Sequence, residues 1–552
     1  MAYRPTRRSK LVPILFTLVV LAAVAWWLAG IPLQNAHEAW VAGDFETAKA
    51  QLDRGARFKL RPADYEHLYS AVLLSEGREQ EARPYLESLA QRQPDFIAPI
   101  SKTEVASRLI REGRYQALLD YDTMVSERRG NPELAMYRAA AQTATGDLQG
   151  ARATFATLDQ SAMPEERYAA LRRAIEQREE GAFPLLLDGT GGVIASWNPA
   201  NQDLVTVDSS FLSLVDRSGG VTSLEANLDV DSVTGAIQTT LDPSVQRAAR
   251  DALGSRRGSI VVIDPETHGI LAMASSAGSG ELQNLALSGT YEAASVIKTL
   301  TAVQALQSDL DLDAMFPLEC KGFSVIDGQQ FFDWARHGTV ADLDEAMAVS
   351  CNVAFGAMGL GLGAPRMIPW LKKVGFGSSV DLGLVKTGLG TLVGDPLTNY
   401  QTANMGIGLE HYRINAIHLA MIGDMLANRG IWTSPTLIAK RFTILGDELQ
   451  TETPPEGTRV AEADAVERTL KAMQAVVTSD RGTGRAARID GLDFSMKTGT
   501  SGSRPFDALI VAVAPTENPS MVVAIIAEGV GPAEHEGAAI IRAFLEKVRA
   551  RL

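Results

Sequence analysis

The sequence has few of the residues on which metal and cofactor enzymes depend. Its 552 residues include only two cysteines, Cys320 and Cys351, and seven histidines. No His-Glu-x-x-His string and no closely spaced His/Cys cluster occurs, which disfavours a metal hydrolase. A Gly-x-Ser-x-Gly elbow and a Walker A loop are also missing, which disfavours α/β-hydrolase and P-loop chemistry. We therefore expect no metal and no cofactor.

Positive charge is also scarce. Lysine and arginine number 52 against 66 acidic residues, a net charge of −14, which argues against a nucleic-acid partner. Hydrophobic residues make up 46% of the chain, enough for two or three domains with cores of their own.

The one long apolar run lies near the N-terminus. Four basic residues precede the uncharged run 11–33, which is long enough to span a bilayer, and Trp26 and Trp27 near its end suit the membrane interface. We predict a cytoplasmic tail at 1–10, a single-pass anchor at 11–33 and an extracytoplasmic remainder. A cleaved signal peptide is the alternative, but its apolar core would be shorter.

A glycine recurs with a period near 34 after this run. Gly43, Gly77, Gly113 and Gly146 are 34, 36 and 33 residues apart. Five positions later stand Ala48, Ala82, Leu118 and Ala151. This period is typical of helix–turn–helix repeats, and residues 35–180 resemble degenerate tetratricopeptide repeats. Such repeats bind partner proteins, although a spacer that lifts the next domain off the membrane is the simpler alternative. Residues 183–235 then predict a small β linker domain, with a hairpin at 185–195 and strands near 204 and 211.

Three short strings follow in order in the C-terminal half: Ser295-Val-Ile-Lys298, Ser350-Cys-Asn352 and Lys497-Thr-Gly-Thr500. Each string can occur by chance in a chain of this length. The evidence therefore lies in the presence of all three in this order and in the local context of each. Residues 291–306 predict a helix that brings the Ser295 hydroxyl and the Lys298 amine within reach of each other. A lysine activates a serine only if burial or a second cation lowers its pKa, and Lys497 is the candidate cation. A capping serine followed by a solvated lysine is the simpler interpretation of the first string alone.

The other two strings predict polar groups around this pair. Ser350 and Asn352 follow a helical stretch at 343–349, where a hydroxyl can relay a proton and a carboxamide can hold a substrate amide or the lysine. Lys497, Thr498 and Thr500 predict a strand edge with a cation and hydroxyls suited to a carboxylate, and Gly499 permits close approach to the backbone. A polar helix junction and a strand that ends in a turn are the simpler alternatives.

From residue 236 to 552 the chain resembles the transpeptidase domain of penicillin-binding proteins, in which these three strings occur together. The Gly406-Ile-Gly408 and Gly482-Thr-Gly484 strings agree with the family pattern. The resemblance implies an α/β (α+β) fold with a five-stranded antiparallel sheet and a helical lobe.

The resemblance also implies roles for the residues of the three strings. Ser295 would be the acylated nucleophile, Lys298 its base and Ser350 a proton relay assisted by Asn352. Lys497, also a catalytic residue, would bind the terminal carboxylate of a D-Ala-D-Ala stem peptide of peptidoglycan or of a β-lactam together with Thr498 and Thr500. Gly499 would belong to the same substrate-binding strand. The N–H groups of Ser295 and Thr500 would form the oxyanion hole.

The chain departs from the family at two places. Ala293-Ala294 replaces the usual Pro-Gly before the nucleophile, and Ala508-Leu509 replaces an aromatic pair. We predict a membrane-anchored D,D-transpeptidase without a glycosyltransferase domain. A D,D-carboxypeptidase or endopeptidase would use the same residues, a β-lactamase would need an added base that we do not find, and a catalytically weak scaffold or β-lactam sensor would use the repeats to recruit partners.

The two cysteines leave a choice between a disulfide and separate thiols. A disulfide is permitted outside the cytoplasm, but Cys351 lies inside the Ser350 string, where a thiol more often serves as a small buried side chain.

Overall fold

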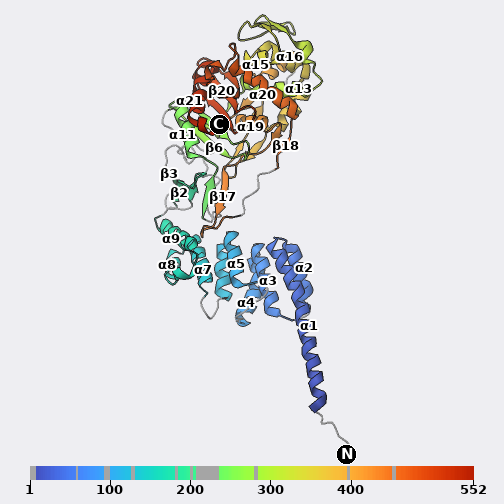
Figure 1. The fold of residues 1–552 in the computed structure, drawn as a ribbon, viewed down its shortest axis with the longest axis vertical. Helices are drawn as coiled ribbons and strands as arrows, with labels where there is room; N and C mark the ends of the chain where they lie inside the picture. The colour runs from blue at the N-terminus through green and yellow to red at the C-terminus, as the bar shows by residue number, and fades with distance from the viewer. Residues whose placement is uncertain are drawn as a thin grey trace, which may run out of the picture. The chain divides into compact units, whose positions relative to one another are not determined.

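The structure, a computed structural model, forms two compact units (Figure 1). It describes residues 8–57, 60–92, 100–125, 131–180, 185–198, 203–206, 235–278, 284–394, 398–449 and 456–552. The first unit comprises residues 1–184, 231–236 and 442–449, and the second comprises residues 185–230, 237–441 and 450–552.

The first unit is built of successive α-helices that form antiparallel hairpins. They are α1 (Arg8–Val41), α2 (Phe45–Ala56), α3 (Pro62–Ser75), α4 (Glu79–Arg92), α5 (Lys102–Arg111), α6 (Tyr115–Val125), α7 (Pro132–Ala144), α8 (Leu148–Phe155), the short η1 (Gln160–Ala162) and α9 (Glu165–Glu179). Helices α1 and α2, α3 and α4, α5 and α6, and α7 and α8 contact each other in pairs.

The four periodic glycines occupy the turns between the two helices of each hairpin. Gly43, Gly77, Gly113 and Gly146 all have positive φ, between 71° and 85°, a conformation that other residues adopt only with strain. The side chains five positions later, Ala48, Ala82, Leu118 and Ala151, are buried. The period therefore predicted the turns and the packing positions correctly, while membership of the tetratricopeptide family stays a prediction.

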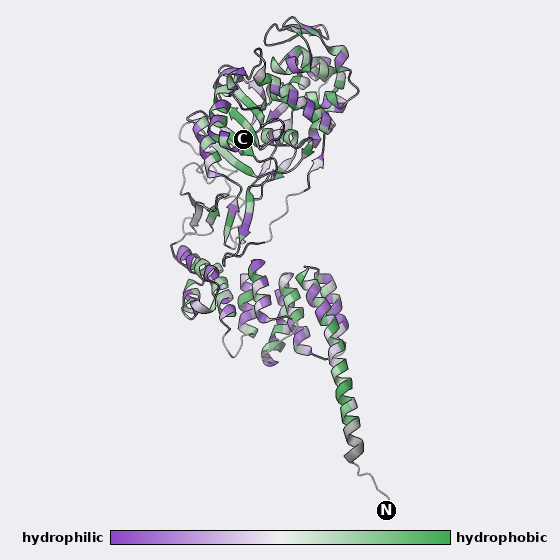
Figure 2. Ribbon diagram, viewed as in Figure 1, coloured by the Kyte–Doolittle hydropathy of each residue, from purple (hydrophilic) through white to green (hydrophobic). Residues whose placement is uncertain are grey.

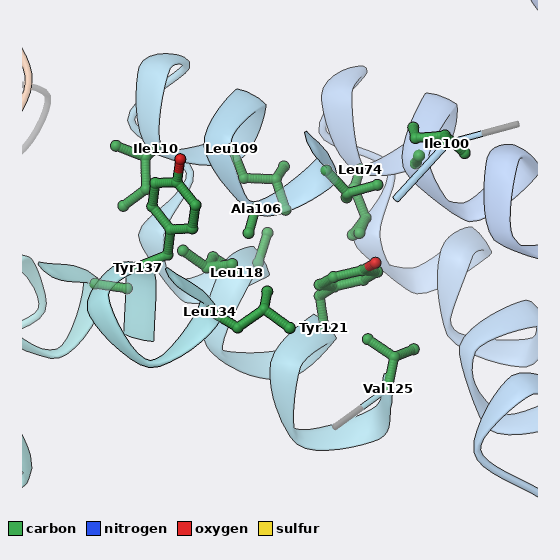
Figure 3. Close-up of a cluster of buried hydrophobic side chains, with 14 of the residues drawn as sticks. Leu74, Ile100, Ala106, Leu109, Ile110, Leu118, Tyr121, Val125, Leu134 and Tyr137 are labelled. Carbon is green, nitrogen blue, oxygen red and sulfur yellow. The ribbon is translucent and has the colours of Figure 1, made fainter. Parts of the chain in front are cut away.

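A continuous hydrophobic core joins these hairpins. In Figure 3 Ala106 and Leu109 of α5 point toward Leu118 of α6 and Leu134 of α7. The same core includes Ile444 and Leu445 from the segment 442–449. Arg167 of α9 forms an ion pair with Asp447 of that segment at 2.8 Å. Each hairpin thus buries its apolar face against its neighbours, as stacked helical repeats require.

Helix α1 extends from the apolar run into the first hairpin without a break. Its residues 14–41 are long enough and apolar enough to cross a membrane (Figure 2). Only 6% of their most apolar window is buried. Leu33 and Trp40 are nevertheless buried in the core of the first unit. The Tyr65 hydroxyl donates to the Ala29 carbonyl at 2.9 Å. The predicted anchor and the first helix of the hairpins are therefore one helix.

The second unit contains a five-stranded antiparallel sheet in the order β19-β20-β21-β5-β6, as the resemblance implied. Its strands are β5 (Gly258–Ile263), β6 (Ile270–Ser276), β19 (Ser495–Ser501), β20 (Asp507–Ala514) and β21 (Met521–Ala527). Every residue of β5 and β21 is buried, so both faces of the sheet are covered. Strand β19 lies at one edge, where its outer side is free to form part of a site.

Helices cover the sheet and form a lobe beside its β19 edge. They are α11 (Pro243–Leu253), α12 (Leu285–Ser288), α13 (Lys298–Leu306), α14 (Leu312–Met315), α15 (Leu343–Ala348), α16 (Asn352–Leu362), α17 (Ala364–Lys373), α18 (Asn399–Ile407), α19 (Ala416–Ala427), α20 (Ala463–Thr478) and α21 (Ala538–Val548). Helix α19 packs against β5, β20 and β21, and α11 packs against β5, β6 and α21. Helix α20 contacts α13, α15 and β19, and so connects the lobe to the edge strand.

Short strands elsewhere in the second unit form sheets of two or three strands. They are β7 (Tyr291–Glu292), β8 (Leu318–Cys320), β9 (Phe323–Ile326), β10 (Gln329–Phe332), β11 (Gly338–Val340), β12 (Ser379–Asp381), β13 (Lys386–Gly388), β14 (Thr391–Leu392), β15 (Tyr412–Ile414), β16 (Ile431–Trp432) and β18 (Thr458–Arg459).

The predicted linker region forms part of a larger sheet. Strands β1 (Leu185–Leu187), β2 (Val193–Asn198) and β3 (Asp203–Thr206) form an antiparallel meander. β4 (Ala236–Thr239) and β17 (Ile438–Phe442) extend it to five strands in the order β17-β4-β1-β2-β3. The predicted strand near residue 211 lies outside the described residues.

The Gly146 turn gives a direct test of the helical hairpins. Because Gly146 has a φ of 85° and nothing lies within 4 Å of an added Cβ, Gly146→Ala acts through backbone strain alone. We expect it to reduce the local stability of the α7–α8 hairpin by about 1 kcal/mol, and Gly146→Asn to reduce it less because Asn tolerates this conformation. Hydrogen–deuterium exchange of the α7 and α8 peptides measures the difference, and equal exchange in both variants would contradict it.

Candidate active site

The three strings converge on one pocket in the second unit. Its volume is about 440 Å³, and Ser295, Ser350, Asn352, Thr498 and Thr500 line it. The strings come from a turn before α13, the junction of α15 and α16, and the edge strand β19. Residues separated by more than 200 positions are thus brought together as the sequence predicted.

Ser295 lies on a turn rather than on a regular α-helix. The region predicted as one helix from residue 291 begins with β7, continues as a 3₁₀ turn (Ala294–Ile297) and becomes helical only at Lys298. Ala294 has a φ of 49°, in the left-handed region, and this reversal separates the strand from the turn. The predicted helix start was therefore wrong by seven residues, because a strained residue interrupts the apolar helical pattern.

Two close backbone approaches hold this turn. The Ala294 N–H donates to the Gly408 carbonyl at 2.9 Å. A Cβ added to Gly408 would lie 2.0 Å from the Ala294 carbonyl oxygen. On the other side, a Cβ on Gly499 would meet the Val296 nitrogen at 3.3 Å. Gly499 therefore permits β19 to approach the nucleophile turn, whereas the sequence suggested approach of a ligand.

Lys298 is completely buried and hydrogen-bonded to the second string. Its Nζ donates to the Ser350 carbonyl at 2.7 Å, to Ser350 Oγ at 3.1 Å and to Asn352 Oδ1 at 2.7 Å. Burial lowers the pKa of Lys298 to about 8, while the Asp333 carboxylate opposes this shift. Among the described residues, the hydrogen bonds of this amine go to Ser350 and Asn352 and not to the Ser295 hydroxyl. The buried amine is a stronger candidate base than a solvated lysine, because its pKa is close to neutral pH.

Lys497 is the second buried amine. Its Nζ donates to Ser350 Oγ at 2.9 Å and to the Thr498 carbonyl at 2.8 Å. Burial, followed by the charge of Lys298, lowers the pKa of Lys497 well below its ordinary value. The sequence suggests Lys497 as the cation that lowers the pKa of Lys298, but burial is the largest cause at Lys298, and it is the charge of Lys298 that lowers the pKa of Lys497.

Ser350 accepts hydrogen bonds from both amines. Two donated bonds occupy both lone pairs of its Oγ, so its own proton is available for a group in the pocket. Ser350 has a φ of 53°, and in this conformation its carbonyl and its hydroxyl both contact Lys298. Asn352 also donates through Nδ2 to the Phe332 carbonyl at 3.3 Å, which fixes the orientation of its side-chain oxygen.

The hydroxyls of β19 face the same pocket. Thr498 Oγ1 lies 2.7 Å from Thr483 Oγ1, and the Thr483 N–H donates to the Ala348 carbonyl at 2.9 Å. Thr500 Oγ1 accepts from the Ala533 N–H at 3.0 Å. The edge strand is therefore tied to the end of α15, and its polar groups are supported on both sides of the pocket.

Several pocket residues carry no recognisable sequence signal. Besides the strings, the wall includes Trp334, Thr483, Arg504 and Phe506. Only Thr483 belonged to a string noted in the sequence, Gly482-Thr-Gly484, and no role was assigned to it there. Ala508 and Leu509 are fully buried in β20 and do not line the pocket, so this departure from the family pattern does not alter the wall directly.

Both cysteines lie below this pocket wall. Cys320 and Cys351 are free and buried, as expected of small buried side chains. Cys351 is the N-cap residue of α16, where its Sγ accepts from the Ala354 N–H. Asp333 lies between the two thiols, and although burial would raise its pKa, hydrogen bonds from His337, Cys351 and Val353 and the charge of Lys298 hold it at about 2.

Comparison with known proteins assigns the family. The family model described as the penicillin binding protein transpeptidase domain matches residues 258–548, more than half of the chain. The chain therefore belongs to the penicillin-binding protein transpeptidase family.

Curated relatives are about a quarter identical to this chain over the aligned regions. The peptidoglycan D,D-transpeptidase PbpA of Mycolicibacterium smegmatis is 27% identical over 54% of this chain and 68% of its own length. The peptidoglycan D,D-transpeptidase MrdA of Acinetobacter baumannii is 25% identical over 59% of this chain and 57% of its own length. The probable peptidoglycan D,D-transpeptidase PbpC of Pseudomonas aeruginosa is 27% identical over 50% of this chain and 49% of its own length. The chain thus spans about half to two thirds of these relatives.

Solved structures have the same fold. The D,D-transpeptidase domain of a peptidoglycan glycosyltransferase from Eggerthella lenta superposes with a TM-score of 0.58 at 23% identity, over 67% of this chain and 99% of that one. The imipenem acyl-enzyme complex of penicillin-binding protein A from M. tuberculosis superposes with a TM-score of 0.57 at 21% identity, over 66% of this chain and 98% of that one.

The strain at Ala294 predicts that glycine is favoured there. A left-handed alanine costs about 1–2 kcal/mol, of which the greater freedom of glycine in the unfolded chain offsets part. We expect Ala294→Gly to stabilise the second unit by about 0.5–1 kcal/mol. Ala293→Gly is the matched control, because Ala293 has an ordinary φ of −69°. We expect this variant to lower the stability of the second unit by about 0.5–1 kcal/mol. Denaturant unfolding followed by the fluorescence of the second unit compares the two variants, and a loss in both would contradict the strain argument.

Proposed function

We propose that this chain is a membrane-anchored peptidoglycan D,D-transpeptidase that forms an acyl-enzyme at Ser295 and also reacts with β-lactams. The observation that carries the proposal is the hydrogen-bonded set formed by Lys298, Ser350 and Lys497 at the wall that Ser295 lines. The names of the relatives, peptidoglycan D,D-transpeptidases, and the acyl-enzyme complex of a structural neighbour support the same reaction class.

In the first step Ser295 Oγ attacks the carbonyl carbon of the penultimate D-alanine. Lys298, as the neutral amine, takes the hydroxyl proton as the new C–O bond forms. The N–H groups of Ser295 and Thr500 bind the oxyanion, because a backbone donor at an edge strand needs no reorganisation. Lys497, Thr498 and Thr500 bind the terminal carboxylate of the donor peptide.

The leaving amine then needs a proton. The Ser350 hydroxyl donates its proton to the departing nitrogen and takes one from Lys298, so the C–N bond breaks, D-alanine leaves and Lys298 becomes neutral again. The occupied lone pairs of Ser350 Oγ support this direction of transfer. An amine of a second stem peptide reverses the sequence: it loses a proton to the same relay, attacks the ester and releases Ser295.

The membrane arrangement follows from the N-terminal charges. The basic residues before the apolar part of α1 orient the N-terminus to the cytoplasm, so the chain that follows the anchor lies outside it, where stem peptides are found. We propose that the chain has no glycosyltransferase activity, because helical hairpins precede the catalytic unit. A partner protein on these hairpins is a further element of the proposal, supported by a hollow of about 350 Å³ that Lys49, Tyr69 and Tyr85 line in part.

Hydrolysis is the alternative with the same residues. A D,D-carboxypeptidase or endopeptidase would release the acyl group to water instead of an amine, and release of D-alanine without cross-linked dimers would favour it. A scaffold or β-lactam sensor would retain the pocket and lack turnover.

Acylation tests the proposed nucleophile directly. We expect the full-length protein in detergent to form a stable adduct with benzylpenicillin at Ser295, because a β-lactam ring has no leaving group that can diffuse away. Intact-mass and peptide mass spectrometry locate the adduct. Ser295→Ala should form none, while the control Ser308→Ala, which changes a serine just beyond α13, should react as the wild type does. A folded wild-type chain without an adduct would contradict the enzyme proposal and favour the scaffold.

The pH dependence tests the proposed base. The pKa of Lys298 is lowered to about 8, so the amine is mostly protonated below this pH and mostly neutral above it. Because the neutral form takes the serine proton, we expect the second-order acylation rate to rise about tenfold per pH unit below the midpoint and to level off above about pH 8. Stopped-flow acylation with a fluorescent penicillin measures the profile. A rate that is flat between pH 6 and 9 would exclude Lys298 as the base.

A further inference from the structure

The apolar part of α1 ends at a defined height below the first hairpin. The apolar run begins at Leu11, and a helix needs about 20 residues to cross the hydrocarbon core of a bilayer, so α1 leaves this core near Gly30. Trp26 and Trp27, one turn earlier, are 54% and 67% exposed. Such rings are typical of the membrane interface. The residues of α1 around Gly30 therefore mark the level of the lipid headgroups.

The end of α2 and the start of α3 pack against α1 at this same level. The Tyr65 hydroxyl donates to the Ala29 carbonyl at 2.9 Å. A Cβ added to Gly55 of α2 would lie 1.7 Å from that hydroxyl, so glycine permits the three helices to meet there. The apolar part of α1 continues beyond this point, away from the hairpins (Figure 1). The connection between α2 and α3 therefore lies at the membrane side of the first hairpin.

Arg61 holds this connection against the interfacial part of α1. Its Cζ lies 5.4 Å from the centroid of the Trp26 ring. Its Nη1 lies 2.8 Å from the position that a Cβ on Gly30 would occupy. Its Nε forms an ion pair with Asp64 at 2.7 Å, and its side chain is 16% exposed. The charge of Arg61 is therefore compensated within the chain, and the side chain has a structural role.

Two further arginines at this level carry uncompensated charge. Arg54 lies in the last turn of α2, and Arg57 is its C-cap residue in a helical conformation. Both are exposed, and among the residues that the structure describes neither guanidinium forms an ion pair. Because they are three positions apart, they lie on the same face of the helix. The neighbouring Asp53 accepts a hydrogen bond from the Tyr69 hydroxyl of α3 at 3.2 Å.

The chemistry of this surface fits a phospholipid headgroup. A guanidinium group presents a planar fork of donors that matches the oxygens of a phosphate. A basic residue near a bilayer surface strengthens the binding of anionic lipid about fivefold. Leu28 and Ile31 of α1 are exposed at the same height, so the surface beside the two arginines is the bilayer itself. A membrane of negative charge is also the partner that complements them electrostatically.

We propose that Arg54 and Arg57 bind the headgroup phosphates of anionic phospholipids in the extracytoplasmic leaflet of the membrane that α1 spans. The inference rests on the membrane anchor of the proposed function and not on its reaction. A single helix would leave the first hairpin free to tilt about the anchor. A second attachment through the two arginines fixes the orientation of this hairpin relative to the bilayer.

The lipid selectivity of the full-length protein tests the proposal. The protein is reconstituted in nanodiscs of equal amounts of phosphatidylglycerol and phosphatidylcholine, and native mass spectrometry compares the lipids that it retains. Relative to the wild type, we expect the preference for phosphatidylglycerol to fall about fivefold in Arg54→Gln and in Arg57→Gln, and about 25-fold in the double variant. The basic residues before Leu11 are present in every variant, so their contribution cancels.

Arg111→Gln is the matched control. Arg111 is an exposed arginine in the last turn of α5, and within the described part of the chain it forms no ion pair. It precedes the turn inside a hairpin, whereas Arg57 precedes the connection between two hairpins, and antiparallel helices place these two kinds of turn at opposite ends. We therefore expect Arg111→Gln to retain the preference of the wild type, although it removes the same charge.

Hydrogen–deuterium exchange in nanodiscs locates the contact. We expect the peptide at the end of α2 to exchange more slowly with phosphatidylglycerol than with phosphatidylcholine alone, and the double variant to lose this difference. A preference for phosphatidylglycerol that is equal in the wild type and the double variant would overturn the proposal. Its loss on addition of inorganic phosphate at constant ionic strength would overturn it in favour of a free-phosphate site.

The same samples separate this inference from the proposed reaction. A chain that does not enter nanodiscs would contradict the anchor and with it the lipid contact. A chain that enters them, reacts with benzylpenicillin and shows no preference for phosphatidylglycerol would overturn only the lipid contact. In Ser295→Ala we expect the full preference without any acylation, because the two sites share no residue.

Discussion

The structure of the second unit depends on the burial of two lysine amines beside one hydroxyl. Lys298 and Lys497 are both fully buried, and each donates to Ser350 Oγ. Removing an ammonium group from water costs far more free energy than a single hydrogen bond returns. Its neighbours must therefore supply oxygen atoms on several sides. The Ser350 and Thr498 carbonyls and the Asn352 side chain supply them. The same burial that disfavours the charged amines brings the pKa of Lys298 close to neutral pH, where it can accept a proton.

The fold meets this requirement by joining two layers. The sheet places Lys497, because β19 is held in register along its whole length by β20, with Lys497 opposite Val511. The helical lobe places Lys298 on α13 and Ser350 at the end of α15, and α20 packs against α13, α15 and β19. Neither layer contains the complete set of groups. The pocket therefore lies where the edge strand meets the lobe, and a shift of β19 by one residue would turn Lys497 away from Ser350.

Local patterns in the sequence predicted these groups, and long-range contacts supplied the rest. The serine, lysine and threonine positions lie in short strings, and the turn glycines repeat at a fixed period, so both were found. The start of the Ser295 helix was missed because Ala294, with a φ of 49°, has no sequence signature of strain. Trp334 and Phe506 reach the pocket from segments outside the strings, and no pattern in the sequence marks them. Likewise, β1 pairs with β4 and so joins the linker strands to the catalytic region. The alternation of polar and apolar residues within one strand does not reveal which strand it pairs with.

Asp333 connects the catalytic groups to the two buried thiols, Cys320 and Cys351. Its carboxylate offsets the burial of Lys298, accepts the Val353 N–H at the start of α16 and contacts both thiols. Such a carboxylate needs support of its own, because an isolated buried charge is unstable. Ser350 also has a left-handed backbone, which costs about 1–3 kcal/mol and persists only where the surroundings fix it. The Trp334 and Val353 N–H groups and the charge of Lys298 support the carboxylate. The hydrogen bonds that both lysine amines donate to Ser350 Oγ fix the strained serine, so each buried charge stabilises the geometry that the other requires.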